Sequence, residues 1–197
     1  LSEGTALKEP IHEGLPASRK ALERVHWTEY LDNFEKGSLD QVMLRRIGLP
    51  WSSGLVKRTL ASSGGTLLAG KLALEYGMAI NLGGGTHHAF PGYGAGFCIL
   101  NDVSVALRQL RAEGLINRAL IVDLDVHQGD GTAWIHREEP EIFTFSMHGE
   151  RNYPFSKVDS TLVVGLPDGT GDETYLKELC YHLPRVLSAA APDLIFF

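Results

Sequence analysis

The stretch IVDLDVHQGDG, residues 121–131, decides how the chain is interpreted. Its apolar start belongs to a run that predicts a buried strand over 119–124. Side chains at every second position of a strand share one face, so Asp123, Asp125 and His127 are expected to project together. Carboxylate oxygens and an imidazole nitrogen are a suitable partial ligand set for Zn²⁺. The stretch therefore predicts a metal site; the plainer alternative is a strand end whose aspartates bind loop amides.

A second stretch, NLGGGTHHAF at 81–90, combines three glycines with two adjacent histidines. The glycines follow a predicted strand over 78–82, and they allow the backbone to approach a ligand closely or to adopt positive φ. His87 and His88 titrate near neutral pH and suit general acid–base work, with the nearby aspartates available to orient them. The alternative is a flexible loop with two surface histidines. A phosphate-binding loop is excluded, because no GxxxxGK[ST] motif is present.

Apolar periodicity predicts that strands and helices alternate along the chain. Helices are expected over 18–37, 39–46, 55–76, 101–113, 132–137 and 172–189, and strands over 78–82, 119–124, 142–147, 161–166 and 193–197. Residues 1–16 are polar and predict an irregular lead-in. This alternation favours an α/β fold with a mostly parallel sheet, whose site lies beyond the carboxyl ends of the strands.

Composition limits the class of protein. The 197 residues are 44% apolar and 21% charged, which excludes a disordered chain and fits one domain or a large part of one. A net charge of −6 lacks the positive field of a nucleic-acid binder. No apolar run reaches the roughly 18 residues of a membrane helix. Cys98 and Cys180 provide no disulfide framework, and no signal peptide is visible, so a cytoplasmic location is expected.

The two ends of the sequence suggest a fragment. The chain begins at Leu1 without an initiator methionine, and it stops at Phe197 on a predicted apolar strand without a following turn. An unpaired apolar edge strand is an aggregation hazard. We therefore expect the sequence to be part of a longer domain.

Six segments together resemble the histone deacetylase superfamily of zinc amidohydrolases, nearest to the bacterial class IV type. They are IGLPWS, GGTLLAGKLALE, NLGGGTHHAF, GYGAGFCILND, IVDLDVHQGDGT and FTFSMHGERNYPF, within residues 45–197. The resemblance implies a single three-layer α/β domain of the arginase/deacetylase type. It also implies that residues 1–197 are an incomplete domain, truncated at both ends. The first strand, the third zinc ligand (an Asp) and the Tyr that polarises the substrate carbonyl would lie outside the sequence, so the chain as given is expected to be inactive.

The resemblance also implies roles for the polar residues of both stretches. Asp125 and His127 would be zinc ligands, His87 and His88 would lie beside the metal-bound water, and Asp123 and Asp130 would orient His87 and His88, respectively. We hypothesise that His88 is the base and later the proton donor, with His87 acting electrostatically.

Further residues are assigned by the same resemblance. The Gly96 carbonyl would accept the substrate amide, and Phe97 and Phe155 would form the walls of a tunnel for the acyl-lysine side chain. A structural monovalent cation, expected to be potassium, would lie among Asp123, Asp125, His127, Ser146 and Met147.

The implied activity is zinc-dependent hydrolysis of an acylated lysine peptide or a small acylated amine. Some family members carry a rim Asp that holds the peptide backbone, and residues 50–53 (PWSS) contain none, which favours the small amine. Two alternatives remain: a ureohydrolase-type manganese enzyme, which would need more Asp and His ligands, and a catalytically decayed acyl-lysine binding module. No nucleic acid or membrane partner is expected, and the oligomeric state and acyl length stay open.

Overall fold

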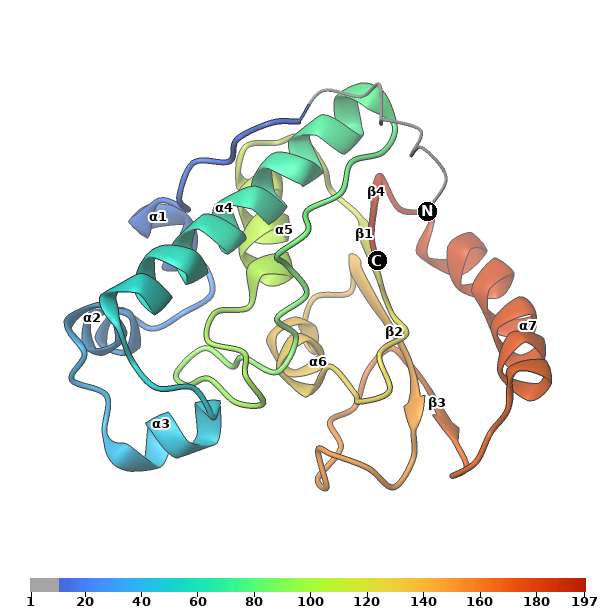
Figure 1. The fold of residues 1–197 in the computed structure, drawn as a ribbon. Helices are drawn as coiled ribbons and strands as arrows, with labels where there is room; N and C mark the ends of the chain where they lie inside the picture. Colours follow the sequence, from blue (N-terminus) through green and yellow to red (C-terminus); the bar gives the residue numbers. More distant parts are fainter. Residues whose placement is uncertain (1–10) are drawn as a thin grey trace, which may run out of the picture.

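A four-stranded, all-parallel sheet forms the centre of the computed structural model, which describes residues 11–197 (Figure 1). The strand order is β3-β2-β1-β4. The strands are β1 (Ala119–Asp123), β2 (Ile142–Gly149), β3 (Leu162–Leu166) and β4 (Leu194–Phe196). The predicted α/β fold with a parallel sheet is confirmed. Of the predicted irregular lead-in, residues 1–10 lie outside the described part of the chain.

Helices cover both faces of the sheet. They are α1 (Arg19–Leu22), α2 (Thr28–Lys36), α3 (Gln41–Ile47), α4 (Ser53–Tyr76), α5 (Asp102–Ala112), α6 (Asp130–His136) and α7 (Asp172–Ala190). Successive β1 side chains alternate, so Ile121 packs with α5 residues such as Leu107, whereas Leu120 packs with Val186 of α7. With α4 and α5 on one side and α7 on the other, the domain has the expected three layers (Figure 1).

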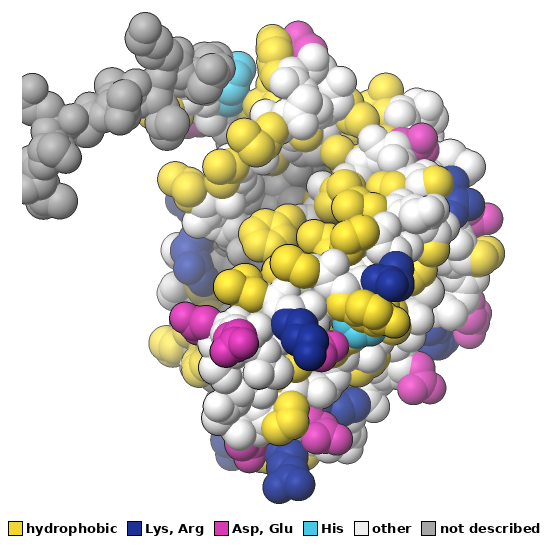
Figure 2. Space-filling view, turned by 90° about the vertical axis from the view of Figure 1, so that its right-hand side faces the viewer, with side chains coloured by type: hydrophobic (Ala, Val, Ile, Leu, Met, Phe, Trp, Pro, Cys, Tyr) yellow, Lys and Arg dark blue, Asp and Glu magenta, His cyan; other side chains and the backbone are white. Residues whose placement is uncertain are grey.

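Part of the outer surface of α7 is apolar. Figure 2 shows the side of the molecule on which α7 lies in Figure 1, and apolar side chains gather in the middle of this face. On α7 itself, Leu176 and Tyr181 are exposed. No helix within residues 11–197 is long and apolar enough to cross a membrane.

The predicted helix over 18–37 is wrong, because the chain forms two helices with a turn between them. At this turn the His26 ring is buried, with Nδ1 3.2 Å from the Phe90 carbonyl and Nε2 accepting from Asn101 N at 2.9 Å. Trp27 is extended and its N–H donates to the Pro91 carbonyl at 2.9 Å. These long-range partners hold the turn and override the helical periodicity.

The predicted strand over 78–82 is also wrong. Met78, Ile80 and Leu82 are exposed, and no strand of the described chain pairs with this segment. A pocket of about 510 Å³ separates it from β4. A strand requires a hydrogen-bonded neighbour, so apolar sequence alone does not produce one here. The other predicted helices and strands begin and end within two residues of the expected positions.

Candidate active site

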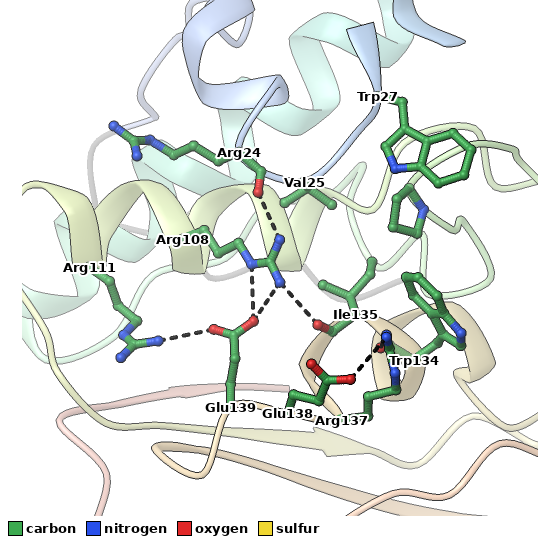
Figure 3. A pocket seen from close by; sticks show the side chains of 11 residues that line it. Arg24, Val25, Trp27, Arg108, Arg111, Trp134, Ile135, Arg137, Glu138 and Glu139 are labelled. Atoms are coloured by element: carbon green, nitrogen blue, oxygen red, sulfur yellow. Dashed lines mark hydrogen bonds and ion pairs between the residues drawn. The ribbon is translucent and has the colours of Figure 1, made fainter. Parts of the chain in front are cut away.

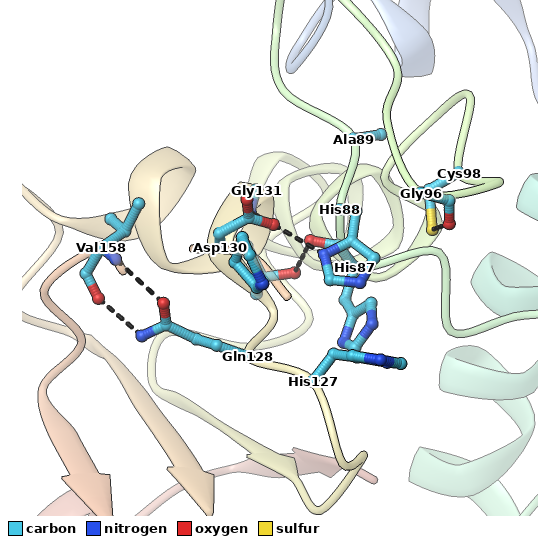
Figure 4. A network of polar contacts seen from close by, with 12 residues as sticks. His87, His88, Ala89, Gly96, Cys98, His127, Gln128, Asp130, Gly131 and Val158 are labelled. Carbon is cyan, nitrogen blue, oxygen red and sulfur yellow. Dashed lines mark hydrogen bonds and ion pairs between the residues drawn. The ribbon is translucent and has the colours of Figure 1, made fainter. Parts of the chain in front are cut away.

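The candidate site lies beyond the carboxyl end of β1, where ligand sites of parallel sheets are found. Asp123 is the last residue of β1, a loop over 124–129 follows, and Asp130 begins α6. The tandem histidines approach from the glycine-rich segment before α5. Figure 4 shows His87, His88 and His127 converging from these segments.

His87 is paired with Asp123. Its Nδ1 donates to Asp123 Oδ2 at 2.7 Å, and Asp123 Oδ1 accepts from Asp125 N at 3.1 Å. Burial lowers the pKa of His87, but the hydrogen bond and the negative charge of Asp123 outweigh burial, so the pKa is raised. Gly129 permits this pair, because a Cβ there would lie 2.2 Å from Asp123 Oδ2.

His88 is paired with Asp130 in a more buried position. Its Nδ1 donates to Asp130 Oδ1 at 2.7 Å, and the same oxygen accepts from Gly131 N at 3.0 Å. The centroids of the His87 and His88 rings lie 4.1 Å apart. Because both Nδ1 atoms face carboxylates, the Nε2 atom of each ring is left for a reacting group.

A buried carboxylate that sequence reasoning missed fixes the segment before the histidines. Asp102 accepts from Gly85 N at 3.1 Å and from Thr86 N at 2.7 Å. The hydroxyls of Thr86 and Thr66 also donate to it. The sequence places Asp102 only at the start of the helix expected over 101–113, and its loop partners are 16 or more residues away.

Main-chain contacts fix the histidine segment from its other side. Thr132 N donates to the His87 carbonyl at 3.0 Å, and Asn101 Nδ2 donates to the Ala89 carbonyl at 3.3 Å. Gly131 allows this close approach, since a Cβ would lie 2.4 Å from Ala89 O. The tandem histidines are therefore held by α5 and α6 together.

The metal-ligand candidates are brought together by a turn, which corrects the expectation that the strand pleat aligns them. His127 N donates to Asp125 Oδ1 at 2.7 Å, and His127 Nδ1 lies 3.1 Å from the same oxygen. Their side chains are 41% (His127) and 50% (Asp125) exposed. A tetrahedral zinc with ligands near 2.1 Å places them about 3.4 Å apart, so these two donors fit one ion. Within residues 11–197 no third His, Cys, Asp or Glu completes a metal group.

The main chain of the loop over 124–129 is firmly anchored, although the side chains of the two metal-ligand candidates are exposed. The buried Gln128 amide donates to the Val158 carbonyl at 2.6 Å and accepts from Val158 N at 2.9 Å (Figure 4). The Val126 carbonyl accepts from Gly149 N and Asn152 Nδ2 at 2.9 and 2.8 Å. The loop therefore presents Asp125 and His127 from a fixed backbone.

The aromatic residues near the expected tunnel differ in their exposure and in their distance from the histidines. Phe97 is exposed and has φ +65°, and Phe155 is 88% exposed. Tyr153, which sequence reasoning missed, lies nearest the histidines, with its ring 5.0 Å from that of His88 and 6.0 Å from that of His127. A Cβ on Gly96 would lie 2.7 Å from the His88 ring, so the segment before Phe97 also reaches the site. Sequence spacing alone does not distinguish Tyr153 from Phe155 two positions later.

The expected monovalent-cation residues lie on adjacent strands and the loop after them. Ser146 of β2 is opposite Asp123 of β1 in the strand register, and Met147 is fully buried. His148, to which the sequence assigned no role, has its Nδ1 2.8 Å from Ser146 Oγ. The structure thus brings Ser146 to the strand end at which the loop over 124–129 begins.

The protein has an α/β fold with a parallel sheet. Beyond the carboxyl ends of its strands lie two histidines bound to carboxylates and two metal-ligand candidates, which together form a histidine-rich candidate active site. The sequence model of the histone deacetylase domain matches residues 1–197. The chain belongs to the histone deacetylase family.

Individual relatives agree with this assignment. An uncharacterized protein of Picosynechococcus sp. is 52% identical, over all of this chain and 66% of its own length. Histone deacetylase 2 of Arabidopsis thaliana is 30% identical, over all of this chain and 53% of its own length. The crystal structure of an HDAC homolog from Aquifex aeolicus superposes with a TM-score of 0.79 at 24% identity, covering 92% of this chain and 55% of that one. The chain thus spans about half to two thirds of the length of these proteins.

Proposed function

We propose that the full-length protein is a zinc-dependent deacetylase that hydrolyses an N-acyl-lysine or a related acylated amine. One observation carries the proposal: two histidine–carboxylate pairs, each at 2.7 Å, lie beside two metal-ligand candidates. Membership of the histone deacetylase family supports the reaction class. A cytoplasmic location and a bound potassium ion among Asp123, Asp125, His127, Ser146 and Met147 are part of the same proposal.

Asp125 and His127 would hold the zinc, with a third ligand from outside the described residues. When bound, zinc lowers the pKa of a water toward about 7 and polarises the acyl carbonyl. The donor types and their 3.1 Å separation support this assignment.

The two histidines divide the proton chemistry. His88, oriented by Asp130, takes a proton from the attacking water at Nε2 and later donates it to the leaving amine. The raised pKa of His87 favours its charged form, which stabilises negative charge developing on the substrate. Asp123 and Asp130 hold the two rings in these roles.

The acyl chain would lie between aromatic side chains. We assign Phe97 and Tyr153 to its walls, with Phe155 further out, 6.5 Å from the Tyr153 ring. The Gly96 carbonyl would accept the substrate amide hydrogen. The substrate is an acylated lysine in a peptide or a small acylated amine.

The test is acetate release from an acetyl-lysine peptide and from an acetylated diamine by the full-length protein. We expect release that a zinc chelator abolishes and added zinc restores. His88→Ala should lose about 10²–10⁴-fold in kcat, whereas His182→Ala, on α7, should behave as wild type. Turnover by His88→Ala within a few-fold of wild type would refute the assigned base. An absence of release from both substrates, with zinc bound, would refute the proposed substrate class.

A further inference from the structure

The ammonium group of Lys157 is bound differently from the other well-fixed cations of the molecule. In the pocket between α5 and α6, Arg108 and Arg111 both donate to the carboxylate of Glu139, as Figure 3 shows. Within residues 11–197, Lys157 forms no such ion pair, and its hydrogen bonds go only to main-chain carbonyls. The lysine therefore binds to a particular path of the main chain and not to a partner charge.

The two carbonyls that Lys157 binds lie on either side of Tyr153. Its Nζ donates to the Asn152 carbonyl at 2.6 Å and to the Pro154 carbonyl at 2.7 Å. Hydrogen bonds from a charged donor are stronger than those between neutral groups. Burial lowers the pKa of Lys157, and the negative charge of Asp130 opposes this, which agrees with an ammonium group that has exchanged part of its water for carbonyl oxygens.

The segment around Tyr153 has few other supports. At its start Asn152 is bound to the loop over 124–129, and at its end Val158 is bound to the same loop (Figure 4). Between these anchors, the one hydrogen bond that residues 153–156 make within the described part of the chain comes from Lys157. The position of this short segment therefore depends on a single side chain.

Tyr153 is the residue of this segment that reaches the histidines. Its ring centroid lies 5.0 Å from that of His88, in an edge-on arrangement. A Cβ on Gly96 would lie 3.2 Å from Tyr153 Cε1, so the tyrosine also packs on the segment whose carbonyl is assigned to the substrate amide. Because reacting groups tolerate little displacement, a small shift of this ring would change how the acyl chain is held.

We propose that Lys157 is a positioning residue for the wall of the substrate channel: its ammonium group holds the main chain on both sides of Tyr153 and thereby keeps the Tyr153 ring against His88. This inference rests on the proposed deacetylase function, which assigns Tyr153 to that wall. Lys157 acts through Tyr153, so its removal should weaken substrate binding more than it slows the proton transfers at His88.

Steady-state kinetics of the full-length protein on an acetyl-lysine peptide test this role. Lys157→Met removes the donors from a side chain of similar length, and we expect KM to rise about tenfold while kcat stays within about threefold of wild type. Lys157→Arg keeps the charge and several donors, so KM should return to within about threefold of wild type. Lys177→Met changes an exposed lysine on α7 and is the matched control, with KM unchanged.

Fluorine NMR of the full-length protein labelled with 3-fluorotyrosine gives a readout that needs no turnover. Tyr153→Phe identifies the Tyr153 signal by its absence. We expect Lys157→Met to move this signal toward the chemical shift of free fluorotyrosine, because the ring leaves the neighbourhood of His88. The other tyrosine signals should stay in place, and Lys157→Arg should keep the wild-type spectrum.

The inference is overturned when either the Tyr153 signal or the KM of Lys157→Met matches wild type, or when Lys157→Arg is as impaired as Lys157→Met. It is also overturned when all tyrosine signals of Lys157→Met move together, since that indicates a general loss of structure; thermal unfolding checks this. An absence of acetate release by the wild-type protein would refute the proposed function instead, and the fluorine signal would still decide whether Lys157 holds Tyr153.

Discussion

The candidate site has two halves: a histidine half, formed by His87, His88, Asp123 and Asp130, and a metal half, formed by Asp125 and His127. They differ in how many of their contacts come from the described part of the chain. In the histidine half, the side chains of His88 and Asp130 are 5% and 9% exposed and bind each other. In the metal half, the side chains of Asp125 and His127 are about half exposed, and among residues 11–197 each is hydrogen-bonded only to the other residue. The histidine–carboxylate pairs are thus assembled by contacts within this chain, whereas the proposed metal ion and third ligand would have to stabilise the other half. Mutations should therefore affect folding in the first half and metal binding in the second.

Gly131→Ala should produce the largest effect, by breaking the histidine half. A Cβ there would lie 2.4 Å from the Ala89 carbonyl oxygen, so the segment that carries His88 has to move. We expect the free energy of unfolding to fall by about 1–3 kcal/mol, and activity about 100-fold, because catalytic groups tolerate little displacement. Urea denaturation and acetate release measure both.

The matched control is Gly54→Ala, since Gly54 is likewise the second residue of a helix. Its Cβ would meet only Ser52 Oγ at 3.7 Å. Alanine there should be neutral or stabilise by up to about 1 kcal/mol. Equal behaviour of the two variants would show that the close approach of α6 to the histidine segment is unimportant.

Asp102→Asn should destabilise the histidine half nearly as much. The buried carboxylate accepts hydrogen bonds from Gly85 N and Thr86 N. Asparagine has an NH₂ group in place of one of the two oxygens, so at least one of these backbone N–H groups would face another donor. We expect a loss of about 1–3 kcal/mol together with lower activity. Asp40→Asn is the control, because Asp40 is an exposed N-cap at which Asn serves equally well. Unfolding curves that coincide for the two variants would contradict the role given to Asp102.

Acidification should weaken the support of the histidine half through His26. Burial lowers the pKa of His26 to about 4, below its ordinary value of 6.5. Its stabilising contribution is therefore complete above pH 6.5 and is lost as the pH falls toward 4, because the unfolded chain binds the proton first. Between pH 7 and 5.5 this amounts to about 1 kcal/mol.

His26→Gln isolates this effect from other buried histidines such as His136, whose pKa is also lowered by burial. The difference in unfolding free energy between wild type and variant should shrink as the pH falls from 7 to 5.5. A difference that is constant across this range would contradict a neutral, buried His26.

Asp125→Asn should have the smallest effect on folding, because it changes the metal half and not the histidine half. The side chain is half exposed, so we expect the unfolding free energy of the metal-free protein to change by less than about 0.5 kcal/mol. Zinc content of the full-length protein should nevertheless fall, as measured by elemental analysis. Retention of one zinc per chain would exclude Asp125 as a ligand.

Local sequence pattern predicted the strands of the sheet, because β1 and its neighbours are apolar runs bounded by turns. It also singled out the histidines and aspartates that the structure places together. It failed at 78–82, where a strand depends on a partner rather than on composition. It failed again at His26, whose ring binds main-chain groups more than 60 residues away.

Within the site, the residues that sequence reasoning missed act through distant partners. From the sequence, Asp102 is an ordinary acidic residue in the first turn of a helix, and only the folding of the glycine-rich loop onto it shows its role. Tyr153 and Phe155 have similar side chains, and only the path of the backbone brings the first beside His88. Which of these residues belongs to the site therefore depends on the folded chain and not on the local sequence pattern.

The paired hydrogen bonds between the Gln128 amide and Val158 restrict what the position tolerates. The side chain has to donate one hydrogen bond and accept another at the same distance from its Cα. Among the twenty residues, only glutamine carries a donor and an acceptor side by side at this distance. Glutamate offers no donor, asparagine is shorter by one methylene, and methionine provides neither group. A saturation library at residue 128, selected for activity, should therefore yield glutamine in almost every active variant.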